Sequence, residues 1–319
     1  MCSSKYLSIL SLASILPWAL CAEEGGGGHY TPGATASFID ALPYEPGFAY
    51  VNQFLYYGGD FSGSARLPLG GSLVAGVEAT SYADVNVLLY QSSLELFGGR
   101  YAAAAAIPLV RLDIDVSGSI TGRRGSTLKR GASDRAEGLG DIYVAPFMLV
   151  WKSGDIKYDT RFGLYAPTGK YDEDDLSNLG KNYWTFEPSA SVSYLGSKNG
   201  IEATAFVGVD LNTENRDTDY QTGEQVHLDL TLAQHFPLGK GFAGIGANAF
   251  YYQQIAGDSG DGAVLGDFEG RTVGIGPVIS YAAKIGGSDV VFEVKWLPEL
   301  DTEKRLEGDY VWVKAAVLF

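Results

Sequence analysis

The chain has 319 residues, of which 38 are acidic and 23 are basic, so its net charge is −15. Hydrophobic residues make up 46% and charged residues only 19%, and the chain contains 42 glycines and 20 tyrosines. This hydrophobic and aromatic content excludes intrinsic disorder. The acidity, and the absence of any basic stripe, exclude nucleic acid as an expected partner. The composition predicts a large structure built mainly of strands.

Residues 1–22 have the features of a secretory signal peptide. A lysine precedes an apolar run over residues 7–20, which is too short to span a bilayer as a helix. Small residues follow, and cleavage after Cys21 or Ala22 fits equally well; a lipoprotein site at Cys21 is the alternative. Cleavage after Ala22 removes both cysteines of the chain, Cys2 and Cys21, so we expect an exported protein without disulfides.

Most of the remaining chain alternates between apolar and polar residues with a period of two, as β-strands with two different faces do. In residues 201–211, for example, the odd positions are aliphatic and the even ones include Glu202 and Asp210. No later run of apolar residues is long enough to form a transmembrane helix. The pattern predicts twelve strands, over residues 48–57, 84–93, 99–117, 139–152, 155–167, 183–195, 200–212, 224–236, 241–255, 271–284, 288–298 and 309–319.

The connections between these strands fall into two classes. Tight turns are expected at residues 153–154, 196–199, 237–240 and 285–287. Long polar loops are expected at residues 58–83, 118–138, 168–182, 213–223, 256–270 and 299–308. An even set of antiparallel strands with short turns at one end and long loops at the other is typical of an outer-membrane β-barrel.

The polar face of these strands carries many mid-strand charges, whereas the opposite face carries almost none. A soluble β-sandwich would pack the apolar faces into a shared core, which the many alanines and tyrosines would fill poorly. In a barrel the apolar face contacts lipid, where an arginine or lysine at mid-depth costs about 2–4 kcal/mol. We therefore predict an all-β, antiparallel transmembrane barrel with the charged face inward. The residues expected to line the lumen and influence permeation are Arg111, Asp113, Lys157, Asp159, Arg161, Glu187, His227, Asp229, Glu293 and Lys295.

Opposite charges in this set are expected to pair across neighbouring strands and brace the wall. A constriction that selects permeants by charge is the functional alternative. A barrel of eight strands is filled by its own side chains, whereas one of sixteen strands leaves an aqueous channel. The lumen of a twelve-stranded barrel is intermediate in width.

The C-terminal strand ends on an aromatic residue and has an unbroken apolar face. Val313, Val317 and the final Phe319 lie on that face. The pattern resembles the C-terminal signal by which bacterial barrel assembly machinery recognises its substrates. It places the tight turns in the periplasm and the long loops outside the cell.

Three segments resemble one family of outer-membrane proteins. Residues 25–48 (GGGGHYTPGATASFIDALPYEPGF), 166–172 (APTGKYD) and 178–188 (NLGKNYWTFEP) are similar to the SphA-like transporters of the "MetA-pathway of phenol degradation" family. This resemblance covers nearly all of the chain after the signal peptide. It implies a barrel that takes up hydrophobic or aromatic compounds.

The N-terminal segment, residues 23–47, is too short to form a domain and too apolar to remain a free tail. It contains Phe38, Ile39 and Leu42, followed by prolines that interrupt regular structure. We expect it to fold into the periplasmic mouth or the lumen as a plug, with a disordered leader as the alternative. The predicted organisation is a signal peptide (1–22), this segment (23–47) and the barrel (48–319).

The sequence gives little support for catalysis or metal binding. His227 and His235 lie on the polar face of one strand with Asp229 near His227, but no serine stands at a recognisable nucleophile elbow. The acidic runs at 172–175 and 258–269 lack the ligand spacing of a calcium loop. We expect no enzyme, no metal and no cofactor.

The expected location is the bacterial outer membrane. The expected partners are its lipids, lipopolysaccharide, the barrel assembly machinery and small hydrophobic solutes. One interpretation of the basic segment 123–135 is that it binds the phosphates of lipopolysaccharide. The alternative is a mobile charged loop. The expected function is passive uptake of small hydrophobic or aromatic compounds. A structural or adhesive barrel is the alternative, and a lipid-acting barrel enzyme is a remote one.

Overall fold

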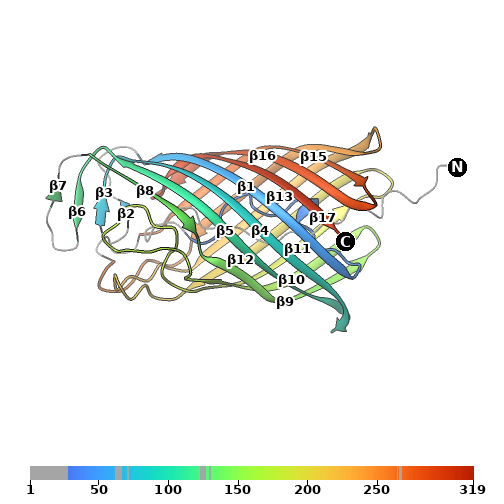
Figure 1. The fold of residues 1–319 in the computed structure, drawn as a ribbon, viewed down its shortest axis with the longest axis horizontal. Helices are drawn as coiled ribbons and strands as arrows, with labels where there is room; N and C mark the ends of the chain where they lie inside the picture. Colours follow the sequence, from blue (N-terminus) through green and yellow to red (C-terminus); the bar gives the residue numbers. More distant parts are fainter. Residues whose placement is uncertain are drawn as a thin grey trace.

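Twelve wall strands, tilted against the long axis, form a closed antiparallel barrel (Figure 1). The computed structural model describes residues 28–61, 67–69, 72–122, 127–128, 131–263, 265 and 268–319. The predicted signal peptide, residues 1–22, and both cysteines lie outside these residues. Among them no helix is long and apolar enough to cross a membrane. The prediction of an all-β barrel is confirmed.

Each wall strand pairs with its neighbours in sequence, and β1 pairs with β17 to close the ring. All twelve predicted strands are present. Their bounds are β1 (Gly47–Phe61), β4 (Val77–Leu96), β5 (Gly99–Val116), β8 (Ala132–Leu139) with β9 (Ile142–Ser153), β10 (Ile156–Ala166), β11 (Thr185–Leu195), β12 (Ile201–Asn212), β13 (Gln225–Leu238), β14 (Gly241–Gln254), β15 (Arg271–Ile285), β16 (Ser288–Glu303) and β17 (Glu307–Leu318).

The predicted strand over residues 139–152 is longer and is broken in two. Strands β8 and β9 both pair with β5, β8 with its second half and β9 with its first half. Gly140 and Asp141 form the break between them. The two pieces therefore serve as one wall strand, and the break has a structural role that is described below.

The ring is closed where the two ends of the barrel sequence meet. Along β1 the register runs from Ala49 opposite Leu318 to Asp60 opposite Glu307. Beyond it, Phe48 and Phe319 exchange two backbone hydrogen bonds of 3.0 Å. The terminal aromatic is thus part of the wall. The side chains of Val313 and Phe319 point outward and are exposed, and that of Val317 is half-buried on the same face.

Short turns and the C-terminus lie at one end of the barrel and the long loops at the other (Figure 1). The long loops carry a small second sheet made of β2 (Leu67–Leu69), β3 (Ser72–Val74), β6 (Ile120–Gly122) and β7 (Thr127–Leu128). This sheet was not predicted, because its strands are too short to show a period. The first predicted loop, 58–83, is also shorter than expected, because β1 and β4 continue to Phe61 and from Val77.

The prediction of a long loop at residues 299–308 is wrong. Strand β16 continues to Glu303 and β17 begins at Glu307, so only three residues connect them. Arg305 turns inward, lies 4.6 Å from the ring centre of Tyr252 and donates a hydrogen bond to the Tyr310 hydroxyl at 3.1 Å. The polar composition that suggested a solvated loop instead supplies a buried cation that holds a tight turn.

The two faces of the wall strands differ in polarity, as the alternation predicted. In β12 every even-numbered residue from Glu202 to Asn212 is buried, whereas the odd-numbered residues are exposed or half-buried. On the same outer face of neighbouring β13 lie Leu230 and Leu232, which are 44% and 65% exposed. Such exposed aliphatic residues are the expected surface of a protein that meets lipid.

Arg111 and Asp113 do not line the lumen as predicted. In β5 the inward positions are Val110, Leu112 and Ile114, so the two charged residues point outward. Arg111 pairs there with Asp113 at 3.0 Å. The outer face of β5 is apolar up to Leu109 and charged from Arg111 onward, because this end of the strand rises above the hydrocarbon layer. Polarity alone therefore gave the wrong face beyond the membrane boundary.

The lipid contact of the outer face predicts a depth-dependent cost for charge. We expect Leu230→Arg, near the middle of β13, to lower the free energy of unfolding by about 2–4 kcal/mol in urea titrations of vesicle-embedded protein. The matched control, Leu238→Arg, lies on the same face beside a turn and should cost about 0–1 kcal/mol. Equal costs at both positions would contradict a lipid-facing outer surface.

Candidate functional site

The described N-terminal segment lies inside the barrel. Residues 28–43 are all buried, and the segment includes the 3-10 helix η2 (Phe38–Asp40). At one end, His29 contacts Asp141 and Thr185, near the long loops. At the other end, the segment runs into β1 at the turn end of the barrel. The residues considered for a plug, Phe38, Ile39 and Leu42, have no more than 1% of their surface exposed.

Charged residues of the inner wall hold the backbone of this segment. The Asp229 carboxylate accepts a hydrogen bond from the Gly33 N–H at 3.0 Å and one from the Thr35 hydroxyl at 3.1 Å. The Lys295 ammonium donates to the carbonyls of Gly33 at 3.2 Å and Thr35 at 3.0 Å. Gly33 has φ +78°, and a Cβ there would lie 2.0 Å from Leu297 Cδ1, so only glycine fits this close approach.

Asp40 joins the segment to itself and to two wall strands. Its carboxylate accepts hydrogen bonds from the Ser37 N–H and hydroxyl, which caps η2. The Lys314 ammonium donates to both carboxylate oxygens, at 2.7 and 2.9 Å, and the Lys295 ammonium lies 3.6 Å away. One carboxylate of the segment thus pairs with cations from two wall strands, β16 and β17.

Wall side chains also contact the part of the segment that lies nearer the turn end of the barrel. Glu202 accepts a hydrogen bond from the Phe38 N–H at 2.7 Å and one from the His235 ring at 2.6 Å. The Lys157 ammonium donates to the Leu42 carbonyl at 3.0 Å. Wall residues from five different strands, β10, β12, β13, β16 and β17, therefore contact the segment through charged side chains.

The predicted lumen residues separate into groups. Arg161 pairs with Asp159 on its own strand at 2.6 Å and also donates to the Asp40 carbonyl. Glu293 lies 3.4 Å from Lys295 on its own strand and 3.6 Å from Lys314 on the next. Salt bridges across neighbouring strands are thus fewer than expected, since the N-terminal segment takes up much of the charge.

Glu187 and His227 come together with Asp210 as a third, buried group. The His227 Nε2 atom lies 3.9 Å from a Glu187 oxygen and 3.7 Å from an Asp210 oxygen. The contact between His227 and Asp229 that the sequence allowed is not formed, because Asp229 is occupied by the N-terminal segment.

A second sector of the inner wall is apolar. It lies on β1, β4 and β5, where inward side chains are almost entirely aliphatic. These residues belong to one buried hydrophobic cluster with Phe38, Ile39 and Leu42. This sector was not predicted, because the alternation in the sequence was interpreted with its charged side inward on every strand. Its main members are Val51, Leu55, Val85, Val87, Val110, Leu112 and Ile114.

Asp141, at the break between β8 and β9, joins the N-terminal segment to both ends of the loop between β10 and β11. Its carboxylate accepts hydrogen bonds from the N–H groups of Thr168, Gly169 and Lys181 at 2.7–2.9 Å, and from the His29 ring at 2.9 Å. His29, residues 166–172 and residues 178–188 are parts of the three segments that carried the family resemblance. The aspartate on which they converge has no distinctive sequence context and was not predicted.

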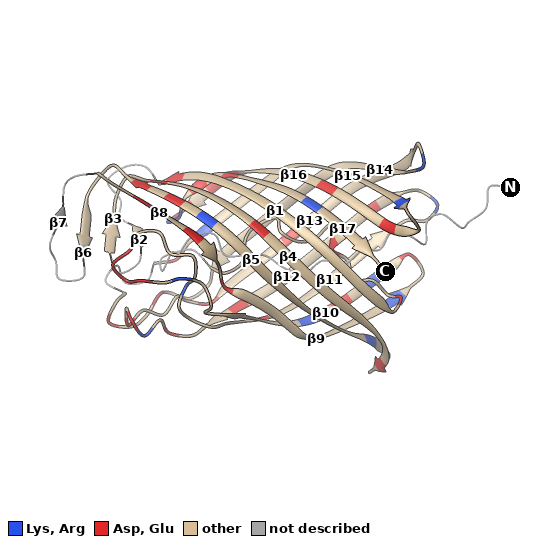
Figure 2. Ribbon diagram, in the orientation of Figure 1, with Lys and Arg blue, Asp and Glu red and all other residues tan. Residues whose placement is uncertain are grey.

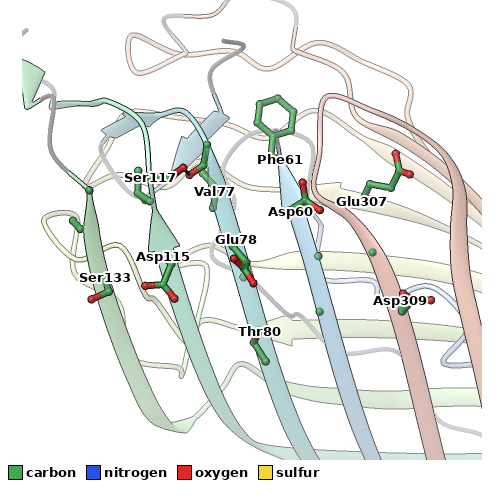
Figure 3. A pocket seen from close by; sticks show the side chains of 18 of the residues that line it. Asp60, Phe61, Val77, Glu78, Thr80, Asp115, Ser117, Ser133, Glu307 and Asp309 are labelled. Atoms are coloured by element: carbon green, nitrogen blue, oxygen red, sulfur yellow. Dashed lines mark hydrogen bonds between the residues drawn. The ribbon is translucent and has the colours of Figure 1, made fainter. Parts of the chain in front are cut away.

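The outer wall near the loops contains an acidic hollow of about 840 Å³ (Figure 3). Its acidic lining residues, Asp60, Glu78, Asp115, Glu307 and Asp309, come from β1, β4, β5 and β17. Figure 2 shows the acidic residues gathered toward this end of the barrel. Like Arg111, these side chains lie above the apolar band. Six of the 13 residues of the basic segment considered for lipopolysaccharide binding, 123–135, lie outside the described residues, among them Arg123, Arg124, Lys129 and Arg130.

Two long loops pack against each other at the mouth around Asp258. Its carboxylate accepts hydrogen bonds from the Tyr220 hydroxyl, the Gly223 N–H and the Gln254 side chain. Gln221 and Ser259 form a β-bridge beside it. Burial raises the pKa of Asp258 to about 6, although these hydrogen bonds lower it in part.

The closed barrel with long loops at one end and a membrane-facing apolar band defines an outer-membrane β-barrel protein. A family model described as a putative MetA-pathway of phenol degradation matches residues 62–315. The chain belongs to this family. Comparison with curated protein sequences gave no match.

Comparison with solved structures also found likenesses. An outer membrane channel from Pseudomonas putida F1 is 15% identical with a TM-score of 0.61, over 91% of this chain and 99% of that one. The β domain of the Bordetella autotransporter BrkA is 13% identical, with a TM-score of 0.46 over 86% and 100% of the two chains. A Pseudomonas aeruginosa FadL homologue is 8% identical, with a TM-score of 0.37 over 86% and 89%. The first of these likenesses supports the barrel fold.

The raised pKa of Asp258 predicts that the packing of the two loops depends on pH. Because protonation favours the buried state, the stabilisation is complete below about pH 4 and is lost as the pH rises through 6. A pKa raised from 3.8 to about 6 corresponds to about 3 kcal/mol. Hydrogen exchange at Gly223, compared at each pH with that of Asp258→Asn, should therefore accelerate up to about a hundredfold by pH 8. A constant ratio between the two proteins would refute this assignment.

Proposed function

We propose that the barrel is a passive channel for small hydrophobic or aromatic compounds, with the N-terminal segment as a plug. The observation that carries this proposal is the division of the inner wall into a charged sector and an apolar one. The charged sector fixes the segment through polar contacts. The apolar sector offers a continuous surface on which an aromatic or aliphatic solute can move without losing its favourable contacts.

The apolar sector extends along most of the barrel. On β4 the inward positions run from Val77 near the long loops to Leu89 near the turns, and all of them except Ser81 are aliphatic. A water-filled porin would line this path with polar and charged residues. Membership in a family named for phenol degradation agrees with an aromatic solute.

The plug must move for a solute to pass. Residues 28–43 occupy the lumen and are held by many hydrogen bonds of ordinary strength rather than by a covalent link. Each such bond contributes about 1 kcal/mol, or somewhat more when one partner is charged. A displacement that breaks a few of them at a time is therefore accessible on a biological timescale. The remaining contacts keep the segment attached.

The other functions considered for the chain have weaker support. A structural or adhesive barrel does not need an apolar inner sector. A lipid-acting enzyme would need an outward-facing nucleophile with a base beside it, whereas all three histidines are buried inside. We propose that the protein is not an enzyme. We also propose that the assembly machinery recognises the apolar face ending at Phe319, and that lipopolysaccharide contacts the outer rim of the barrel.

Deletion of residues 28–45 should open the lumen. We expect single-channel conductance in planar bilayers to rise several-fold over that of the intact protein, because the deletion removes the chain that fills the barrel. Heat-modifiable migration on gels is the check that the shortened protein still folds. An unchanged conductance of a folded deletion variant would eliminate the plug proposal.

The apolar sector should determine which solutes pass. In cells that lack the native protein, Leu112→Asn is expected to slow uptake of an aromatic hydrocarbon about tenfold, since an unpaired amide in an apolar path costs about 1–3 kcal/mol. Uptake of a small polar solute should not fall. The control is Leu109→Asn, which makes the same change on the outer face of β5. Equal loss with both variants, or equal loss for both solutes, would argue against the proposed path.

A further inference from the structure

We propose that Glu187, Asp210 and His227 form a binding site for one divalent transition metal ion, for which Zn²⁺ is the best fit. One ligand atom from each residue lies within 4.8 Å of the others, and all three side chains are fully buried. This site is independent of the proposed transport function. No metal was expected from the sequence, in which the three residues are far apart and only the fold brings them together.

The register of three neighbouring strands creates the cluster. Glu187 is on β11, Asp210 on β12 and His227 on β13. Gly208 stands directly opposite His227, and a Cβ there would lie 2.4 Å from two atoms of the imidazole ring. Because Gly208 has no side chain, the ring can extend across β12 toward Glu187 on β11. The small residue therefore produces the approach of three potential ligands from three strands.

The polar atoms of this cluster are unpartnered to an unusual degree. Both ring nitrogens of His227, both carboxylate oxygens of Asp210 and the Oε1 atom of Glu187 have no hydrogen-bond partner among the described residues. Burying polar or ionised atoms without partners costs several kcal/mol and is rare in folded proteins. The contacts of His227 with the carboxylates, at 3.7 and 3.9 Å, are too long for hydrogen bonds. A bound cation would satisfy these atoms together.

The donor set and its charge fit a divalent ion. Zinc is bound by histidine nitrogen and carboxylate oxygen at about 2.0–2.2 Å, which places tetrahedral ligand atoms roughly 3.4 Å apart. The two histidine–carboxylate separations, 3.7 and 3.9 Å, need to contract by only a few tenths of an ångström, and the two carboxylate oxygens lie within 4.8 Å of each other. Two carboxylates and a neutral imidazole would give an electrically neutral site. Gln225, opposite Asp210 on β13, is also fully buried with an unpartnered amide carbonyl and is a candidate fourth ligand.

The surroundings resemble those of a closed, structural metal site. The Tyr165 hydroxyl donates a hydrogen bond to the other Glu187 oxygen at 3.0 Å, which orients the carboxylate. The imidazole of His227 lies nearly parallel to the rings of Tyr30 and Phe206, with ring centres 3.5 and 5.7 Å away. Tyr30 belongs to the N-terminal segment, so the plug covers the cluster. An ion there would link β11, β12 and β13 beneath the first residues of the plug.

The test is metal retention after refolding. Protein is denatured with a chelator, refolded in detergent with or without Zn²⁺, passed through gel filtration, and analysed for metal per chain. We expect about one ion per chain in the native protein and at least about a tenfold lower content in His227→Gln. The matched control is His235→Gln, on the same face of the same strand but paired with Glu202, which should retain the full amount.

Folding of each variant is checked by heat-modifiable migration, and Glu187→Gln replaces His227→Gln if the latter does not fold. If neither folds, native protein refolded with Co²⁺ should show the visible absorption of tetrahedral cobalt, which Zn²⁺ should abolish. Native protein that retains no more zinc than the variant, or that gives no such cobalt spectrum, would overturn the proposal.

Discussion

Ionised groups inside a narrow barrel need partners, and this constraint organises the whole lumen. Removing an ammonium or a carboxylate from water costs several kcal/mol unless charge or hydrogen bonds replace the hydration. Lys295, Lys314 and Asp229 find these partners in the backbone and the polar side chains of the N-terminal segment rather than in each other. The backbone N–H and carbonyl groups of the segment in turn find hydrogen-bond partners on the wall, although the segment is not part of a β-sheet. Wall and segment therefore stabilise each other.

This mutual dependence explains why the two sectors of the inner wall differ. Charges are concentrated on β10 to β17, where they hold the segment. The strands β1, β4 and β5 contribute aliphatic side chains that pack with Phe38, Ile39 and Leu42. A hydrophobic solute can replace packing contacts on the apolar side while the polar contacts on the other side persist. The three segments that carried the family resemblance in the sequence meet around His29 and Asp141.

Sequence periodicity was sufficient for the fold because the bilayer constrains the outer face so strongly. Twelve strands, their closure and the ends at which turns and loops lie could all be predicted. Arg111 and Asp113 were placed on the wrong face because the lipid constraint ends above Leu109, where charge no longer indicates the inside. The turn at Lys304–Leu306 was missed because the residues around it are as polar as those of a solvated loop. The sequence does not show that Arg305 is buried.

The functional interior was less predictable than the wall. The burial of Phe38, Ile39 and Leu42 agrees with their apolar character, but the partners of Asp40 and Asp141 depend on contacts between segments far apart in the chain. The cluster of Glu187, Asp210 and His227 depends on strand register and on the missing side chain of Gly208. Neither register nor a long-range contact leaves a periodic signal in the sequence.

The central claim is that the charged wall fixes the N-terminal segment inside the lumen. Amide hydrogen exchange of the intact protein in lipid vesicles measures this most directly, because the N–H groups of Gly33 and Phe38 donate to Asp229 and Glu202. The account predicts that residues 29–42 exchange about as slowly as the wall strands. Exchange of these amides at the rate of an unstructured peptide would contradict it.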